Sequence, residues 1–248
     1  MNPKRNKRFL YQLPSMIARV LTLAVIGGSL FLLPVHADVP TLLPKTADAG
    51  GAYRDRMVFF GESTTTHLSA RGGLPRRQIW ADQSGTRMLS PKTPFEPILD
   101  PQTGESLTPS ALCAKEQPAL LVLSFGLNGV MRFIGDKEYY LNCYGRLIDS
   151  LQAASPETRI ILQTVYPVAR ADGYSVDVDT LNAYLQTINS WLPELASRHE
   201  NVRIADTASI LRDRDGRLRT ELADPDGIHL QPTAYTEILT YLCTHAWE

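Results

Sequence analysis

The feature that most constrains the fold of this chain is an alternation of short apolar runs with longer amphipathic segments. The runs cover residues 57–60, 119–125, 159–166 and 202–206. Strands that are buried on both faces have such compositions, because helices cover both sides of a parallel sheet. The runs are also as short as strands and shorter than most helices. We therefore predict that they are strands of one sheet.

Between and after these runs, apolar residues recur at helical spacing in the segments 137–155, 179–199 and 232–247. Pro156 is expected to end the first helix, because the residue before a proline disfavours helical geometry. Asp179 is the expected cap of the second helix. Strand–helix alternation at this spacing predicts an α/β fold, with a central, mostly parallel sheet covered by helices on both faces.

The first 37 residues have the composition of an export signal. A basic stretch at 4–8 precedes an apolar run at 20–33, and Ala37 closes a cleavage-site sequence. The apolar run is shorter than the about 20 residues of a membrane-spanning helix, although residues 16–33 together could act as an uncleaved membrane tether. We expect a signal peptide or N-terminal membrane anchor at 1–37, a linker at 38–55 and one domain at 56–248. That domain would be secreted or extracytoplasmic and membrane-anchored.

Composition narrows the classes of function. Apolar residues make up 44% and charged residues 21% of the 248 residues, as in a globular domain. The formal net charge is −1, and the first 37 residues hold basic but no acidic side chains, so the remainder is acidic. We expect no nucleic-acid partner, because binding nucleic acid needs a basic surface.

Cys113, Cys143 and Cys243 match no metal-site spacing. We therefore expect no metal and no cofactor. The three thiols are predicted to be small, largely buried apolar side chains. A bridge between Cys113 and Cys143 stays open at this stage, and so does the oligomeric state.

Polar residues stand where the predicted strands end. Glu62 and Ser63 follow the first apolar run, and Asn128 follows the second. Asp226 and His229 stand three residues apart, just before the last helix. Ligands of parallel α/β folds bind beyond the carboxyl ends of the strands, so these side chains are expected to meet at one edge of the sheet. A serine, an asparagine, an acid and a histidine together are suited to acyl transfer.

The chemistry explains these residue types. A serine hydroxyl is a poor nucleophile until a base takes its proton, and His229 can be that base because an imidazole titrates near neutral pH. Asp226 can hold the second ring nitrogen if the chain turns back at Gly227. The Ser63 backbone N–H, the Asn128 amide and a glycine N–H are suitable donors for an oxyanion.

The stretches FFGESTTT, SFGLNGV and DGIHLQPTAY resemble, in this order, the sequence blocks of the SGNH/GDSL hydrolase family. The resemblance implies a flavodoxin-like three-layer α/β/α sandwich and ester hydrolysis without a metal. It implies that Ser63 is the nucleophile, that Asp226 and His229 complete the catalytic set, and that Asn128 is an oxyanion donor. Gly85 is our candidate for the glycine that completes the oxyanion hole.

The sequence departs from the family at two positions. Glu62 precedes the nucleophile, and Gly129 follows the asparagine, where the family has aspartate. We expect Glu62 to be a structural brace that accepts backbone N–H bonds from neighbouring loops, rather than an acid or base. His67, four residues after Ser63, is an alternative base that we disfavour, because side chains at this spacing run along the helix.

Two classes of function fit these residues. The first is an exported serine esterase that hydrolyses small acyl esters, O-acetyl above all, on a small molecule or on a carbohydrate or cell-wall glycan. A lipase or thioesterase for longer acyl chains is the alternative within this class. The second class is a non-catalytic glycan-binding module on the same fold, which the intact set of Ser63, Asp226 and His229 disfavours.

Overall fold

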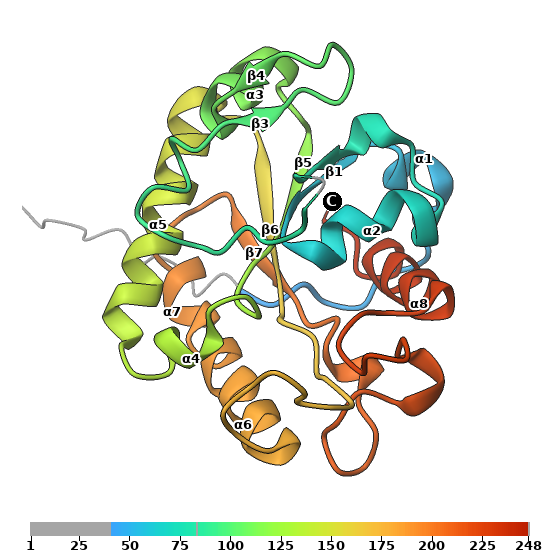
Figure 1. Cartoon of the computed structure of the whole chain (residues 1–248). Coiled ribbons are helices and arrows are strands. Elements are labelled where there is room, and N and C mark those ends of the chain that lie inside the picture. The colour runs from blue at the N-terminus through green and yellow to red at the C-terminus, as the bar shows by residue number, and fades with distance from the viewer. Residues whose placement is uncertain (1–40, 83, 248) are drawn as a thin grey trace, which may run out of the picture. The chain divides into compact units, whose positions relative to one another are not determined.

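The computed structural model describes residues 41–82 and 84–247. Its centre is a parallel sheet of five strands in the order β2-β1-β5-β6-β7 (Figure 1). The strands are β2 (Ile79–Trp80), β1 (Met57–Gly61), β5 (Leu120–Ser124), β6 (Arg159–Gln163) and β7 (Val202–Ala205). This is the strand order of flavodoxin-like folds, so the predicted fold class is confirmed.

Helices cover both faces of the sheet and make three layers (Figure 1). One face carries α1 (Gly50–Arg54), α2 (Ser63–Gly72) and α8 (Pro232–Cys243). The other face carries α3 (Pro109–Glu116), α4 (Val130–Phe133), α5 (Lys137–Ala154), α6 (Val178–Asn189) and α7 (Leu192–Ala196). A small antiparallel pair, β3 (Ile98–Leu99) and β4 (Ser106–Leu107), lies outside the main sheet.

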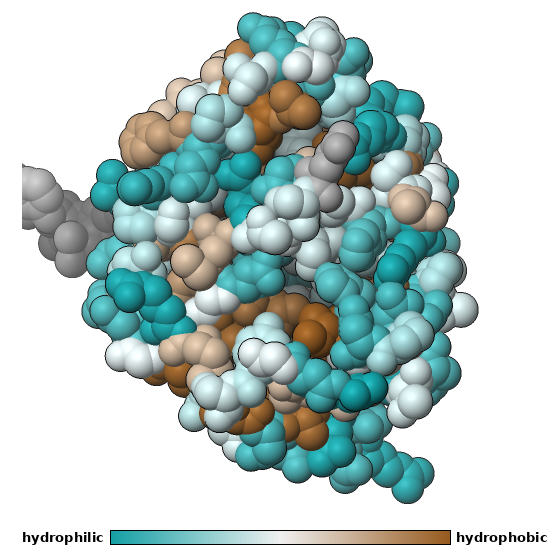
Figure 2. Space-filling model, viewed as in Figure 1, coloured by the Kyte–Doolittle hydropathy of each residue, from teal (hydrophilic) through white to brown (hydrophobic). Residues whose placement is uncertain are grey.

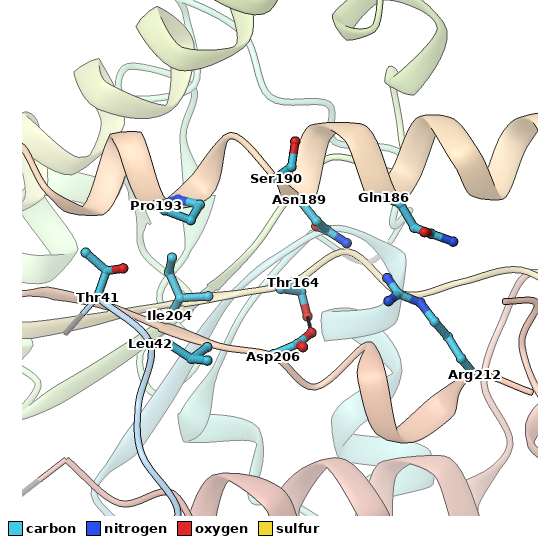
Figure 3. A pocket seen from close by; sticks show the side chains of 10 residues that line it. All are labelled: Thr41, Leu42, Thr164, Gln186, Asn189, Ser190, Pro193, Ile204, Asp206 and Arg212. Atoms are coloured by element: carbon cyan, nitrogen blue, oxygen red, sulfur yellow. Dashed lines mark hydrogen bonds between the residues drawn. The ribbon is translucent and has the colours of Figure 1, made fainter.

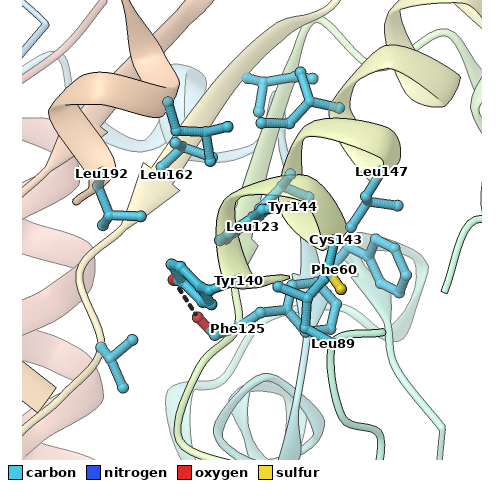
Figure 4. Close-up of a cluster of buried hydrophobic side chains, with 14 of the residues drawn as sticks. Phe60, Leu89, Leu123, Phe125, Tyr140, Cys143, Tyr144, Leu147, Leu162 and Leu192 are labelled. Carbon is cyan, nitrogen blue, oxygen red and sulfur yellow. Dashed lines mark hydrogen bonds between the residues drawn. The ribbon is translucent and has the colours of Figure 1, made fainter. Parts of the chain in front are cut away.

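Neighbouring strand residues point to opposite layers. Phe59 packs in a cluster with Leu68 of α2 and Tyr235 of α8, whereas Phe60 packs in a cluster with Tyr140 of α5 (Figure 4). Both phenylalanines are almost completely buried. Burial on two faces is the reason why these strands are apolar at successive positions.

The surface is mainly hydrophilic on the face seen in Figure 2, with apolar side chains gathered mostly below its centre. The large apolar side chains that are exposed in the described part of the chain are Leu42, Met88, Phe95, Leu99 and Met131.

All four predicted strands are present, but the helix predicted at 179–199 is divided. It forms α6 and α7, and Pro193 stands in the first turn of α7, where its missing N–H costs no hydrogen bond. The predicted cap is also wrong: the side chain of Asp177 accepts from the N–H groups of Asp179 and Thr180. Asp179 instead pairs with Arg217 at 2.6 Å.

The domain begins earlier than position 56. Residues 41–43 run beside β7, with the Leu43 N–H donating to the Ile204 carbonyl at 2.9 Å and the Ile204 N–H donating to Thr41 at 2.7 Å. Tyr53 of α1 is buried in the core. Much of the predicted linker is therefore part of the folded unit.

The predicted export signal at 1–37, including the tether at 16–33, lies outside the described residues. Within residues 41–82 and 84–247, no helix is both long and apolar enough to cross a membrane. Cys113, Cys143 and Cys243 are all buried and carry free thiols, as the first of the two interpretations predicted.

Candidate active site

The predicted nucleophile stands at the junction of a strand and a helix. Ser63 is the first residue of α2 and comes two residues after the end of β1. The loops after β1 and β5 lie on either side of the point where the strand order reverses, which is where flavodoxin-like folds bind ligands. In the part of the chain that the structure describes, the Ser63 backbone N–H donates no hydrogen bond. A helix N-terminus with such an open N–H favours negative charge.

Glu62 binds the neighbouring loop, as predicted. The residue is 4% exposed, and its carboxylate accepts the N–H groups of Gly126 at 2.9 Å, Leu127 at 3.1 Å and Asn128 at 3.0 Å. Burial raises the pKa of Glu62 to about 7, although these three N–H groups act in the opposite direction. The side chain therefore ties the loop after β5 to the junction of β1 and α2, directly before Ser63.

Asp226 and His229 form a hydrogen-bonded pair. The His229 Nδ1 lies 2.6 Å from the Asp226 Oδ2, and the other carboxylate oxygen accepts the N–H groups of Ile228 and His229. Gly227 between them has a φ of 72°, so the bend needs glycine, as predicted. Burial raises the pKa of Asp226, but the hydrogen bonds from His229 and from the backbone lower it to about 2. With Nδ1 donating to the carboxylate, Nε2 is the nitrogen that can accept a proton.

The contact between His67 and His229 connects this turn to helix α2. The rings of His67 and His229 meet edge to face, with centroids 4.8 Å apart and planes at 62°. His67 stands one helical turn after Ser63, so His229 lies beside the first turns of α2. Over the described residues, the Ser63 hydroxyl makes no hydrogen bond to His229. Catalytic hydrogen bonds commonly tighten only when substrate binds.

Gly85 lies against Ser63, and Asn128 lies against Gly85. A Cβ on Gly85 would stand 2.8 Å from the Ser63 Cβ, and the φ of Gly85 is 64°, so both space and backbone geometry require glycine. The Asn128 amide donates to the carbonyls of Gly85 and Arg87, each at 3.0 Å. The Gly85 N–H donates to the Asp82 carboxylate at 2.7 Å. The predicted oxyanion residues are therefore close together, but in this arrangement only the Ser63 N–H is open.

A separate cavity of about 310 Å³ lies beside the edge strand β7, between residues 41–42 and the helices α6 and α7 (Figure 3). It is lined by Thr41, Leu42, Thr164, Gln186, Asn189, Ser190, Pro193, Ile204, Asp206 and Arg212. None of the predicted catalytic residues lines it, so it is distinct from the site around Ser63.

Sequence reasoning did not identify Arg71, which binds the segment that carries Asp226 and His229. Its guanidinium donates to the Leu230 carbonyl at 2.7 Å and to the Asp224 carboxylate at 2.9 Å. The available signal was spacing, because residues 63, 67 and 71 recur every four residues and so share one face of a helix.

Comparison with known proteins identifies the family of this chain. The model of the GDSL-like lipase/acylhydrolase family matches residues 59–236. No curated protein matches the sequence. The fold is similar to that of a candidate platelet activating factor from Streptococcus pneumonia, at 19% identity and a TM-score of 0.50, over 77% of this chain and 87% of that one.

A second solved structure has the same fold. It is a candidate lipolytic protein of the G-D-S-L family from Desulfitobacterium hafniense DCB-2, at 17% identity and a TM-score of 0.50, over 77% of this chain and 98% of that one. The family model covers well over half of the sequence, and the matched range includes Ser63, Asp226 and His229. This chain therefore belongs to the GDSL-like lipase/acylhydrolase family and is an ester hydrolase.

Proposed function

We propose that the protein is an exported serine esterase that removes small acyl groups, O-acetyl above all, from carbohydrate or cell-wall glycan. The observation that carries the catalytic part is the chain of contacts from Asp226 through His229 to His67 on the nucleophile's helix. These contacts support His229 as the base, with its Nδ1 held by Asp226 and its ring near Ser63. Export is supported by the composition of residues 1–37 alone.

In the proposed reaction, the Ser63 hydroxyl attacks the ester carbonyl while the His229 Nε2 takes its proton. Asp226 stabilises the imidazolium that forms, and the imidazolium then protonates the departing alcohol. A water molecule, deprotonated by His229, hydrolyses the acyl-enzyme and releases the acid. The Ser63 N–H at the start of α2 stabilises each oxyanion.

Asn128 joins the oxyanion hole if one of its amide hydrogens turns away from a carbonyl. The two acceptors that it now binds belong to Gly85 and Arg87, and Gly85 packs directly on Ser63. A shift of one amide hydrogen from the Arg87 carbonyl to the oxyanion would keep the contact with Gly85.

The proposal of a small acyl group is supported by the narrow space between Ser63 and Gly85. The Gly85 backbone lies so close that even one added carbon there would contact the Cα and Cβ of Ser63, at 2.9 and 2.8 Å. The proposal of a glycan as acyl acceptor rests on export, because an exported esterase meets acetylated polysaccharides.

One observation favours the alternative of longer acyl chains. Met88 is 39% exposed and packs over Gly129, next to Asn128, where a Cβ on Gly129 would lie 2.6 Å from its sulfur. An exposed, adaptable thioether beside the oxyanion residues could accommodate an alkyl chain.

The test is hydrolysis of p-nitrophenyl esters from acetate to dodecanoate, and of acetylated xylan and peptidoglycan, by the full chain. We expect kcat/KM to be highest for acetate and acetate to be released from at least one glycan. A maximum at the long esters would instead support the lipase alternative.

The matched variant is Ser63→Ala, which should fold normally and lose nearly all hydrolysis, since it lacks the attacking oxygen. A fluorophosphonate should label Ser63 alone in the wild type. Near-full activity in Ser63→Ala would exclude the mechanism.

A further inference from the structure

Three polar residues share one face of α2. Ser63, His67 and Arg71 are spaced four residues apart, so their side chains follow one another along the helix. The segment 224–231, which carries Asp226 and His229, lies against this face. Contacts along the face could therefore set where the base stands relative to the nucleophile.

Arg71 holds this segment at two points. One guanidinium nitrogen donates to the Asp224 carboxylate at 2.9 Å and the other donates to the Leu230 carbonyl at 2.7 Å. Asp224 comes two residues before Asp226, and Leu230 comes one residue after His229. A planar guanidinium with two bound nitrogens fixes orientation as well as distance.

The segment between these two points is closed by its own hydrogen bonds. The Asp224 N–H donates to the His229 carbonyl at 2.8 Å, and the Gly227 N–H donates to the Asp224 carbonyl at 2.8 Å. The Gln231 amide donates to the second oxygen of the Asp224 carboxylate at 2.9 Å. The turn is therefore stiff, so a constraint on Asp224 is passed on to His229.

His67 supplies a second contact, ring against ring. Its Nδ1 is buried and has no partner among the described residues. Burial lowers the pKa of His67, and the charges of Arg71 and His229 lower it further. A neutral His67 does not repel the imidazolium that forms on His229, so its ring can act as a packing surface.

We propose that Arg71 and His67 are positioning residues that hold the His229 ring over the Ser63 hydroxyl. Arg71 acts by holding both ends of the catalytic turn, and His67 acts by packing against the ring. This inference rests on the proposed function, in which Ser63 and His229 carry out the reaction.

The first test compares Arg71→Gln and Arg71→Lys with the wild type. Arg71→Gln should lower kcat by about tenfold or more, because small misplacement of a base is costly, and should change KM by less than about twofold. Arg71→Lys keeps the charge but not the planar pair of donors, so its kcat should lie between those of the wild type and Arg71→Gln. The control is Arg198→Gln, whose arginine bonds Glu194 on α7 and should leave kcat unchanged.

The second test separates packing from proton transfer at His67. His67→Phe keeps a ring at this place and should retain most of kcat, whereas His67→Ala should lose several-fold. Equal losses in both variants would show that a nitrogen of His67 is needed and would overturn its assignment as a packing surface.

The third test does not depend on turnover. In protein labelled with ¹⁵N-histidine, the His229 ring resonances should move in Arg71→Gln toward those of a solvent-exposed histidine, and should stay in place in Arg198→Gln. If Arg71→Gln does not fold, Asp224→Asn tests the same contact with an uncharged acceptor. Unchanged resonances and unchanged kcat in these variants would overturn the proposal. A wild type without esterase activity whose His229 resonances still depend on Arg71 would overturn the proposed function and leave the positioning role intact.

Discussion

At the scale of single residues, the buried Glu62 makes the stability of the fold depend on pH. Its native pKa of about 7 lies above the ordinary 4.5, because burial outweighs three N–H donors. Between these two values the native state keeps a proton that the unfolded chain releases. The contribution of Glu62 to the free energy of unfolding is therefore complete below about pH 4.5 and is lost as pH rises through about 7.

We therefore predict that Glu62→Gln removes part of this pH dependence. Between pH 5 and 7 the free energy of unfolding of the wild type should fall more steeply, by up to about 1.4 kcal/mol per pH unit. The glutamine also turns an N–H donor toward a backbone N–H, which should cost roughly 1–3 kcal/mol. Urea denaturation at several pH values measures both effects, with exposed Glu138→Gln as the control. If the free energy of unfolding fell equally steeply with pH in the wild type and in Glu62→Gln, the raised pKa of Glu62 would be contradicted.

Asn128 is the second residue whose role can be measured directly. Asn128→Ala should lower kcat by about 10²–10³ with little change in KM, as loss of an oxyanion donor does. Asn128→Asp should in addition lower Tm, because it places a carboxylate against the two carbonyls that the amide now binds at 3.0 Å. If Asn128→Ala lowers Tm but leaves kcat unchanged, Asn128 only ties the Gly85 segment in place.

At the scale of elements, the junction of β1 and α2 depends on close contact with β5. Gly61 pairs with Ser124 of β5, and the Glu62 N–H donates to the Ser124 carbonyl at 3.2 Å. From the other side, the Tyr235 hydroxyl of α8 donates to the Thr64 carbonyl at 3.0 Å. Ser63 is thus carried by a junction that is fixed by one strand and one helix.

We predict that Gly61→Ala disturbs this junction. A Cβ at Gly61 would collide with the Thr65 side chain and with the Ser124 carbonyl, and backbone cannot yield as a flexible side chain can. The expected loss is about 1–3 kcal/mol of unfolding free energy, together with a lower kcat. Thermal melts and ester kinetics measure this loss, and Gly51→Ala is the control, since a Cβ there meets only Arg54 at 3.9 Å. A wild-type Tm and kcat for Gly61→Ala would show that the strands can separate without cost.

At the scale of the whole molecule, the start of the described chain closes one side of the domain. Residues 41–43 cover β7, which is an edge strand of the sheet. The Thr46 N–H donates to the Thr244 carbonyl at 2.7 Å and the Ala49 N–H donates to Cys243 at 3.0 Å, so the same segment also holds the end of α8. An uncovered edge strand offers unpaired backbone groups to other chains.

A chain that starts at Gly50 should therefore be less stable than one that starts at residue 38. It lacks Leu43, which is 4% exposed, and the hydrogen bonds along β7. The expected loss is roughly 2–5 kcal/mol, with a Tm lower by several degrees. Thermal melts and light scattering of the two chains test this, and equal Tm values with no added association would show that the segment contributes nothing.

The sequence by itself determined the features that depend on neighbouring residues. The strands at 57–60 and 119–125 follow from local apolar runs, because a strand that is buried on both faces has apolar side chains at nearly every position. The place of Ser63 follows from the end of the first run, and the Asp226–His229 pair follows from three-residue spacing across a glycine turn. Each of these is decided within a few residues of chain.

Only the tertiary structure decided the contacts between distant segments. Arg71 and Asp224 are 153 positions apart, and Asn128 meets the Gly85 carbonyl across 43 positions. The strand at Ile79–Trp80 is too short to show a period, so its place in the sheet depends on pairing with β1. Residues 41–43 are also too few to show a period, so the sequence did not predict that they cover the edge strand β7. Such pairings form between groups that only the folded chain brings together. Local sequence patterns describe neighbouring residues and therefore cannot predict them.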